Sequence, residues 1–389
     1  MDQTNRRNFL ATAAVGAACV ARCTSAEKQS SPSEGNEKYY TVGQRNNHWW
    51  FISPDGEPFF SIAMNHIDSA TLRYAENRHI WQDKYDNSQK RWLQETVTPD
   101  LKAWGFNNIG WTQEAVTRTQ FTNAADEKYI YSQHSRSFTY EEYQWADMPY
   151  CHMLRFIESH QWDTRTLLPD LYGTAFEDWC DYVARDDCVR MAEDPKLIGY
   201  FYTDCPTWVH ARAPEDKAPL FDPDLLKTES GKKQLYDLAT RYYKVTHDAI
   251  RRYDPNHMIF GDRYEGRHPL PEEVLRAAVP YVDVYCFQYF GPPDQLYADL
   301  RRWHDITGKP VMLADASAFR RKTETYPDMI QKLRQEPSVV GWHYCGAYIK
   351  NRCRQQGFRD EQNMVDVELA QTIGDANRET HAWVKQVTG

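Results

Sequence analysis

The sequence predicts a single (β/α)8 barrel, an α/β fold in which eight parallel strands alternate with helices. Three observations predict it. Eight short apolar runs alternate with amphipathic stretches along most of the 389 residues. These runs are nearly continuous in apolar residues, as expected for parallel strands that are buried on both faces. No glycine-rich phosphate loop follows the first run, which argues against a doubly wound open sheet.

The elements of the barrel are expected within residues 46–389. A hairpin around the turn Pro54-Asp55-Gly56 comes first. The eight strands are expected at residues 59–64, 106–111, 153–157, 197–202, 257–263, 282–289, 310–315 and 339–344. Amphipathic helices are expected between them at residues 92–104, 176–191, 232–253, 272–279, 294–304 and 329–334.

The first 45 residues are expected to lie outside the barrel. Asn5-Arg6-Arg7-Asn8-Phe9-Leu10, followed by small apolar residues, is typical of a twin-arginine export signal over residues 1–26. Its apolar part is far shorter than the ~20 residues that span a bilayer. Residues 27–45 read as a polar tether. We therefore expect an exported protein, periplasmic or extracellular, and lipid attachment at Cys23 stays open because Arg22 precedes it.

Composition narrows the possible partners. The net charge is −9, with acidic residues spread along the chain, which argues against nucleic acid and anionic membranes as partners. The cysteines show no CxxC spacing, so neither a metal nor another cofactor is expected. No integral membrane segment is expected beyond the export signal. No sequence pattern indicates the oligomeric state.

In a (β/α)8 barrel the chemistry is built at the C-terminal ends of the strands. Carboxylates, amides, an arginine, histidines and indoles are expected there, namely Asn65, His66, Trp111, Gln113, Glu114, Asp204, Asp262, Arg263, Glu265, Gln288, Asp315, Trp342 and His343. We see no three-ligand metal cluster and no Gly-x-Ser-x-Gly elbow among them. Carboxylates among aromatic rings suit a sugar, because rings stack on its C–H face while polar groups bind its hydroxyls.

Structural alternatives exist for several of these residues. Either tryptophan can belong to the core, and either histidine can be a buried hydrogen-bonded group. Asp262 and Arg263 can form a structural ion pair. Arginines near the strand ends, Arg73, Arg263 and Arg267, are suited to meet sulfate or carboxylate groups on a glycan.

Four segments resemble the retaining (β/α)8 glycoside hydrolases, nearest to the β-agarase-like enzymes of glycoside hydrolase family 50. They are WWFISPDGEPFFSIAMNHID, LKAWGFNNIGWTQE, DPKLIGYFYTDCPTW and KPVMLADASAF, within residues 48–350. The resemblance implies an eight-stranded barrel without a catalytic metal. It also implies an acid/base glutamate that ends strand 4 and a nucleophilic glutamate that ends strand 7. In this chain Cys205 stands at the first position, preceded by Asp204 where the family has asparagine, and Asp315 stands at the second.

These substitutions shape the catalytic hypothesis. We expect Asp204 to be the general acid and Asp315 the nucleophile or base, with Glu114 and Glu265 as reserve candidates for the acid. Retaining enzymes need carboxyl groups about 5–5.5 Å apart and inverting ones about 6.5–9.5 Å, so the shorter aspartates leave the stereochemistry open.

The leading prediction is an exported glycoside hydrolase that acts on a polysaccharide or oligosaccharide. Algal galactans are favoured by the resemblance alone. One alternative is a catalytically inactive carbohydrate-binding barrel, motivated by the missing glutamates. Another is a lyase or isomerase of a sugar acid with Tyr285, Tyr289 or His343 as its base.

Overall fold

The computed structural model describes residues 38–122, 128–157, 169–206, 208–209, 221–266, 270–291, 293–317 and 325–389. They belong to one unit, Gly35–Gly389. The expected export signal, the first part of the expected tether and Arg267 lie outside the described residues. The structure therefore speaks to the barrel and to the segments around it.

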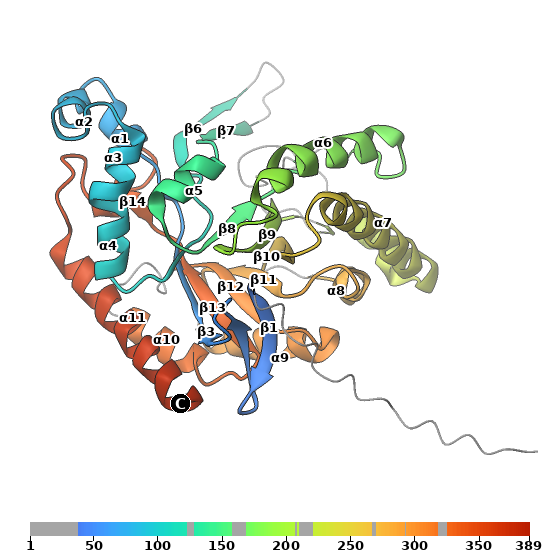
Figure 1. Ribbon diagram of the computed structural model, residues 1–389. Helices are drawn as coiled ribbons and strands as arrows, with labels where there is room; N and C mark the ends of the chain where they lie inside the picture. Colours follow the sequence, from blue (N-terminus) through green and yellow to red (C-terminus); the bar gives the residue numbers. More distant parts are fainter. Residues whose placement is uncertain are drawn as a thin grey trace, which may run out of the picture. The chain divides into compact units, whose positions relative to one another are not determined.

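Eight parallel strands close into a barrel, and their order around it follows their order in the chain (Figure 1). They are β4 (Ser61–Met64), β5 (Asn108–Ile109), β8 (Tyr150–Met153), β9 (Leu197–Asp204), β10 (Met258–Glu265), β11 (Tyr285–Tyr289), β12 (Val311–Ala316) and β13 (Val339–Tyr344). This topology confirms the predicted (β/α)8 fold. The third strand was misplaced, because the apolar residues after Met153 pack outside the barrel and the strand lies before them.

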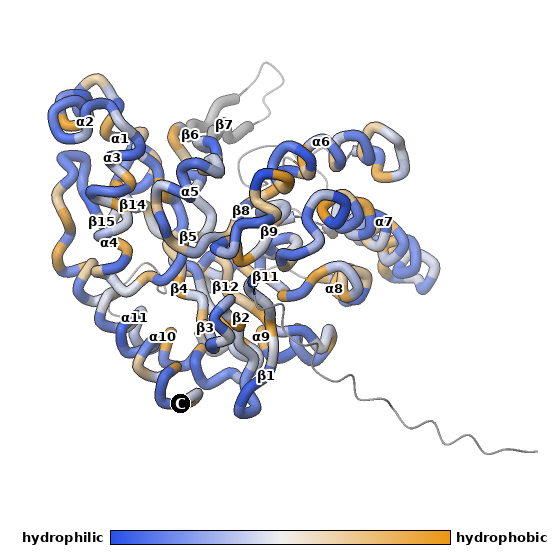
Figure 2. The backbone as a smooth tube through the Cα atoms, in the orientation of Figure 1, coloured by the Kyte–Doolittle hydropathy of each residue, from blue (hydrophilic) through white to orange (hydrophobic). Residues whose placement is uncertain are grey.

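Helices surround the barrel (Figure 1). They are α1 (Ala70–Arg73), α2 (Arg78–Tyr85), α3 (Gln89–Trp92), α4 (Thr98–Ala103), α5 (Tyr140–Ala146), α6 (Thr174–Met191), α7 (Glu229–Tyr253), α8 (Glu272–Ala278), α9 (Pro293–Thr307), α10 (Tyr326–Leu333) and α11 (Val367–Thr388). Blue and orange alternate along α6 and α7 in Figure 2, as expected for helices with one buried and one solvated face. Among the described residues, each helix is too short or too polar to cross a bilayer.

Two apolar clusters hold these layers together. The larger one fills the space between the strands and the helices. The smaller one fills the barrel and includes Phe201, Phe260 and Met312. Burial of this kind stabilises the fold by about 25 cal/mol per Å² of apolar surface. Because apolar side chains fill the barrel, there is no room for a reaction inside it, and its chemistry must lie at its mouth.

A three-stranded antiparallel sheet precedes the barrel. It consists of β1 (Thr41–Arg45), β2 (His48–Ile52) and β3 (Pro58–Phe59). Residues 41–45, expected at the end of the tether, thus pair with β2. The predicted turn is present, since the N–H of Gly56 donates to the carbonyl of Ser53 at 2.8 Å and its φ of 79° favours glycine. Phe51 packs on Phe260, so this sheet closes the N-terminal end of the barrel.

Two smaller sheets follow strands of the barrel. The hairpin β6 (Ala115–Thr122) and β7 (Lys128–His134) lies between β5 and α5. The pair β14 (Ala347–Ile349) and β15 (Gly357–Arg359) follows β13. Both insertions leave the C-terminal ends of barrel strands, so they add side chains to the mouth.

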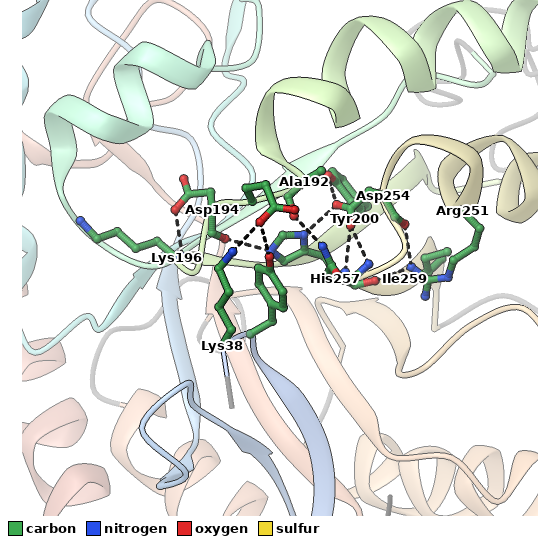
Figure 3. Close-up of polar contacts among 12 residues, drawn as sticks. Lys38, Ala192, Asp194, Lys196, Tyr200, Arg251, Asp254, His257 and Ile259 are labelled. Carbon is green, nitrogen blue, oxygen red and sulfur yellow. Dashed lines mark hydrogen bonds and ion pairs between the residues drawn. The ribbon is translucent and has the colours of Figure 1, made fainter. Parts of the chain in front are cut away.

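A buried polar network ties the N-terminal ends of β9 and β10 together (Figure 3). His257 Nδ1 lies 2.7 Å from Asp254 Oδ2, and Tyr200 donates its hydroxyl to the same oxygen at 2.7 Å. The other ring nitrogen of His257 lies 2.8 Å from the carbonyl oxygen of Asp194. Burial favours a raised pKa for Asp254, but hydrogen bonding to His257 outweighs it and lowers the pKa. This Asp–His pair lies at the structural end of the barrel.

Candidate active site

The carboxylate of Asp315 is anchored at the end of β12. Asn65, which directly follows β4, donates from Nδ2 to Asp315 Oδ1 at 2.7 Å. Asn65 is itself fixed, because its Oδ1 accepts from the backbone N–H of Trp111 at 2.9 Å. Burial favours a raised pKa for Asp315, but hydrogen bonding to His66 and the charge of Arg263 outweigh it and hold the pKa well below its usual range. Asp315, which is 4% exposed, is therefore a buried anion.

His66 lies beside this carboxylate with a φ of 57°, a conformation that non-glycine residues adopt at a cost and often at functional sites. Its Nδ1 is 2.6 Å from the carbonyl oxygen of Gln113, so Nδ1 carries a proton. Its Nε2 lies 3.7 Å from Asp315 Oδ1 and 3.5 Å from Cys345 Sγ. Burial and the charge of Arg354 disfavour the imidazolium, but Cys345 and Asp315 outweigh them and raise the pKa of His66 to about 10.

Asp204 ends β9 and forms an ion pair with Arg263 of β10, with 2.9 Å between Nη2 and Oδ1. Gln288 of β11 donates its side-chain amide to the same oxygen. Arg263 is 0% exposed, and its charge also acts on Asp315, so two carboxylates share one buried cation. A buried guanidinium stabilises an ionised carboxylate. These contacts argue against the predicted role of Asp204 as the proton donor.

The guanidinium of Arg263 stacks on the ring of Trp111, with 3.6 Å between its central carbon and the ring centroid. Trp111 is 3% exposed. One face of this indole is thus covered by a cation, which leaves little of the ring for a sugar. Arg263 is likewise an interior residue that organises carboxylates, instead of a rim residue that meets substrate sulfate.

Trp342 and Asp262 point away from the barrel interior, so the structure removes both from the predicted site. Trp342 packs on Tyr326 of α10, with ring centroids 4.7 Å apart. Asp262 accepts hydrogen bonds from Tyr242 and Tyr243 of α7 at 2.9 and 2.6 Å. The physical reason is strand alternation: their chain neighbours face inward, so they face the helices. Burial raises the pKa of Asp262 to about 6 despite these hydrogen bonds.

His343 lies inside the barrel below Asp315. Its Nε2 is 2.9 Å from Ser61 Oγ, and burial together with the charge of Arg263 lowers its pKa to about 3. His343 is therefore a neutral, hydrogen-bonded support. Gly110 leaves room for this packing, because a Cβ there would lie 2.1 Å from Asn65 Oδ1 and 2.9 Å from His343 Nδ1.

Glu114 and Gln113 lie in the segment after β5. Glu114 pairs with Arg354, with 2.7 Å between Oε1 and Nε, and Gln113 donates from Nε2 to the carbonyl oxygen of Ser135 at 2.9 Å. Arg354 and Cys345 are site residues that sequence reasoning missed. Cys345 directly follows β13, so the signal was present one residue past the expected strand end. Arg354 lies between β14 and β15, where no spacing links it to a strand.

Glu265 is the last residue of β10. It pairs in register with Gln288 of β11, which pairs with Asp315 of β12. Neighbouring strands are about 4.8 Å apart, so the Cα atoms of Glu265 and Asp315 lie about 9–10 Å apart across Gln288. Glu265 is 3% exposed. The site thus contains a second carboxylate in the same row as Asp315.

Three side chains of metal-ligand type also meet here. Within the described part of the chain, potential ligand atoms of His66, Asp315 and Cys345 all lie within 4.8 Å of one another. The sequence did not indicate this group, because Cys345 lies one residue past the expected end of its strand and was not counted among the strand-end residues.

Comparisons with known proteins add information about the fold. No protein-family model and no curated protein matches the sequence. Among solved structures, an exo-β-agarase is similar with a TM-score of 0.65 and 15% identity, over 92% of this chain and 66% of that one. A second agarase has a TM-score of 0.64 and 15% identity, over 91% and 64%. A β-glucuronidase of Bacteroides uniformis has a TM-score of 0.55 and 10% identity, over 87% and 37%.

These similarities confirm the predicted resemblance at the level of the fold. The barrel is one that glycoside hydrolases such as agarases and glucuronidases use. The chain spans 66% of the length of the first agarase and 64% of the length of the second. Activity and substrate must therefore be argued from the site of this chain.

Proposed function

We propose that the protein is a glycoside hydrolase in which Asp315 is the nucleophile or the general base. The observation that carries the proposal is the buried Asp315 carboxylate, held ionised at the mouth of the barrel by Asn65, His66 and Arg263. Retaining and inverting hydrolysis both require one carboxylate that is anionic in the resting enzyme. The fold shared with agarases and glucuronidases supports this class of reaction.

Hydrolysis also needs an acid that protonates the leaving oxygen. Asp204 is poorly suited, because its Oδ1 binds both Arg263 and Gln288. Glu265 lies two strands from Asp315 and is almost fully buried. We assign the proton-donor role to Glu265, and to Asp204 the role of fixing Arg263 between the two carboxylates.

The substrate class to test first is a neutral or acidic polysaccharide, with algal galactans such as agar at the head of the panel. Support for the galactans comes from the agarases among the fold neighbours. Export by the twin-arginine route to the periplasm or cell exterior belongs to the same proposal, because a polysaccharide cannot enter the cytoplasm intact. The support for export is the signal that contains Arg6 and Arg7. A test of export should also determine whether Cys23 carries a lipid.

The test is release of reducing ends from a panel of galactans and glucuronides. Asp315→Asn is expected to reduce turnover by about 10³-fold or more in a protein that remains folded, because it removes the nucleophile or base. Asp83→Asn, on the exposed face of α2, is the matched control and should behave as wild type. Full activity of Asp315→Asn would refute the assignment.

A second comparison separates the two possible acids. An acid variant loses activity on substrates with poor leaving groups and keeps most of it on aryl glycosides with good leaving groups. We expect this pattern for Glu265→Gln. Asp204→Asn should lose activity on both kinds of substrate, because Arg263 loses its partner. The opposite assignment of the two patterns would return the acid role to Asp204.

One specific observation favours a second function. Cys205, which stands where the resembling enzymes have their acid, cannot replace a carboxylic acid well, and Asp204 is committed to an ion pair. A carbohydrate-binding barrel without turnover would account for both. Glycan binding without reducing-end release across the whole panel would support it over hydrolysis.

A further inference from the structure

We propose that His66, Asp315 and Cys345 form a binding site for a divalent transition-metal ion of the zinc class. The three residues come from the C-terminal ends of β4, β12 and β13, which are neighbours in the barrel in the order β12, β13, β4. They offer one imidazole nitrogen, one carboxylate oxygen and one thiolate sulfur. This is a donor set that zinc uses in proteins. The inference goes beyond the proposed hydrolysis and does not depend on it.

The distances between the ligand atoms fit a tetrahedral ion. Typical zinc–ligand lengths of about 2.1 Å to nitrogen or oxygen and about 2.3 Å to sulfur place tetrahedral ligands about 3.6 Å apart for N and S and about 3.4 Å for N and O. Here His66 Nε2 lies 3.5 Å from Cys345 Sγ and 3.7 Å from Asp315 Oδ1. The carboxylate oxygen of Asp315 and the sulfur of Cys345 lie within 4.8 Å of each other, so an ion can be accommodated with side-chain shifts of up to about 1 Å.

The groups around the ligands already have the arrangement that metal sites use. A metal-bound histidine almost always donates its other ring N–H to a carbonyl or carboxylate, which fixes the tautomer. His66 Nδ1 makes that contact with the carbonyl oxygen of Gln113 at 2.6 Å, so Nε2 is aimed at the other two ligands. Asp315 is likewise oriented by Asn65 at 2.7 Å.

A small cavity borders the thiol of Cys345, and its lining does not include His66 or Asp315. A cavity of about 30 Å³ is lined by Cys345, Arg354, Ser317 and Tyr344. A cavity of that volume holds a water molecule. Two of the three ligands are buried and Cys345 is partly exposed, so the ion can enter from this side.

Nearby cations oppose binding and set a condition for it. Arg263 acts on Asp315, and Arg354 Nη1 lies 3.7 Å from Cys345 Sγ. Arg263 also pairs with Asp204 and Arg354 pairs with Glu114, which compensates part of each positive charge. The ion meets two anionic ligands of its own once the thiol and the imidazolium have released their protons. A bound ion occupies Asp315, so it would block hydrolysis.

The test uses Co²⁺ and Zn²⁺ with the purified full chain, without any glycan. Co²⁺ should bind with a stoichiometry of one and produce a thiolate-to-cobalt charge-transfer band. Cys345→Ser should abolish that band and weaken Zn²⁺ binding by about tenfold or more. Cys353→Ser, at a second partly exposed cysteine, is the matched control and should leave both unchanged. A band that persists in Cys345→Ser, or no band in the wild type, would overturn the site.

A measurement on the wild-type protein covers the case in which a variant fails to fold. Zn²⁺ should protect Cys345 from alkylation, as read by peptide mass mapping, and should leave the reaction of Cys353 unchanged. Equal alkylation of Cys345 with and without Zn²⁺ would contradict the proposal. Because neither readout involves sugar cleavage, metal binding can fail while hydrolysis stands, and the reverse.

Discussion

The buried carboxylate of Asp262 should make the stability of the fold depend on pH in a defined direction. Burial raises its pKa from the ordinary value of 3.8 to about 6. An acid whose pKa is raised by folding binds more protons in the folded state between those two values. Stability is therefore lost as pH rises from about 4 to about 6, and the loss is complete above that window. The difference of about 2.2 between the two pKa values corresponds to about 3 kcal/mol.

The substitution Asp262→Asn isolates this contribution. Asparagine keeps the shape, and its oxygen can accept from one of the two tyrosines while its amide nitrogen donates to the hydroxyl of the other, but it carries no titrating proton. Unfolding in urea is measured for wild type and variant from pH 4 to pH 7. The variant should gain about 3 kcal/mol relative to wild type over that range. The exposed Asp83→Asn should show an almost constant difference, and a constant difference for Asp262→Asn as well would refute the reasoning.

Two further substitutions test the packing of the mouth and the role of the opposite end. Gly110→Ala places a Cβ 2.1 Å from Asn65 Oδ1, so it should cost about 1–3 kcal/mol of stability and disturb Asp315, and a wild-type melting curve would contradict the close packing. His257→Ala should cost about 2–3 kcal/mol by leaving Asp254 buried without its partner, yet leave Co²⁺ binding of the folded protein unchanged. If the variant were fully folded and still lost Co²⁺ binding, the N-terminal end of the barrel would be coupled to its mouth.

The sequence was sufficient to predict the barrel, because eight apolar runs and their spacing determine the order of parallel strands. It could not determine which side chains face inward. In a strand buried on both faces the apolar run is continuous, so the sequence does not distinguish residues that face the barrel interior from residues that face the helices. Asp262 and Arg263 are adjacent polar residues in β10, and one faces α7 while the other lies in the barrel. Register shifts around Gly261 make the facing harder still to predict.

Long-range contacts explain the remaining differences. Arg354 reaches the mouth from a segment that no strand spacing predicts, and its ion pair with Glu114 spans 240 positions in the chain. The role that we propose for Asp204 differs from the predicted one for a similar reason. Its position at the end of strand 4 indicated an acid, but its chemistry is set by Arg263 and Gln288, which come from two other strands. The position of a residue along its strand predicts where its side chain lies. Its protonation state depends on neighbouring side chains, which come from other strands.

Two Asp–His pairs at opposite ends of the barrel show why neighbours decide function as well. At the N-terminal end, both ring nitrogens of His257 are engaged, one by Asp254 and one by a backbone carbonyl. At the mouth, His66 has one nitrogen engaged by a carbonyl and turns the other toward Asp315 at 3.7 Å and toward the thiol of Cys345 at 3.5 Å. The first pair has no capacity left for a ligand. The second has a proton, an anion and a thiol beside them, so of these two pairs only the pair at the mouth is equipped for chemistry.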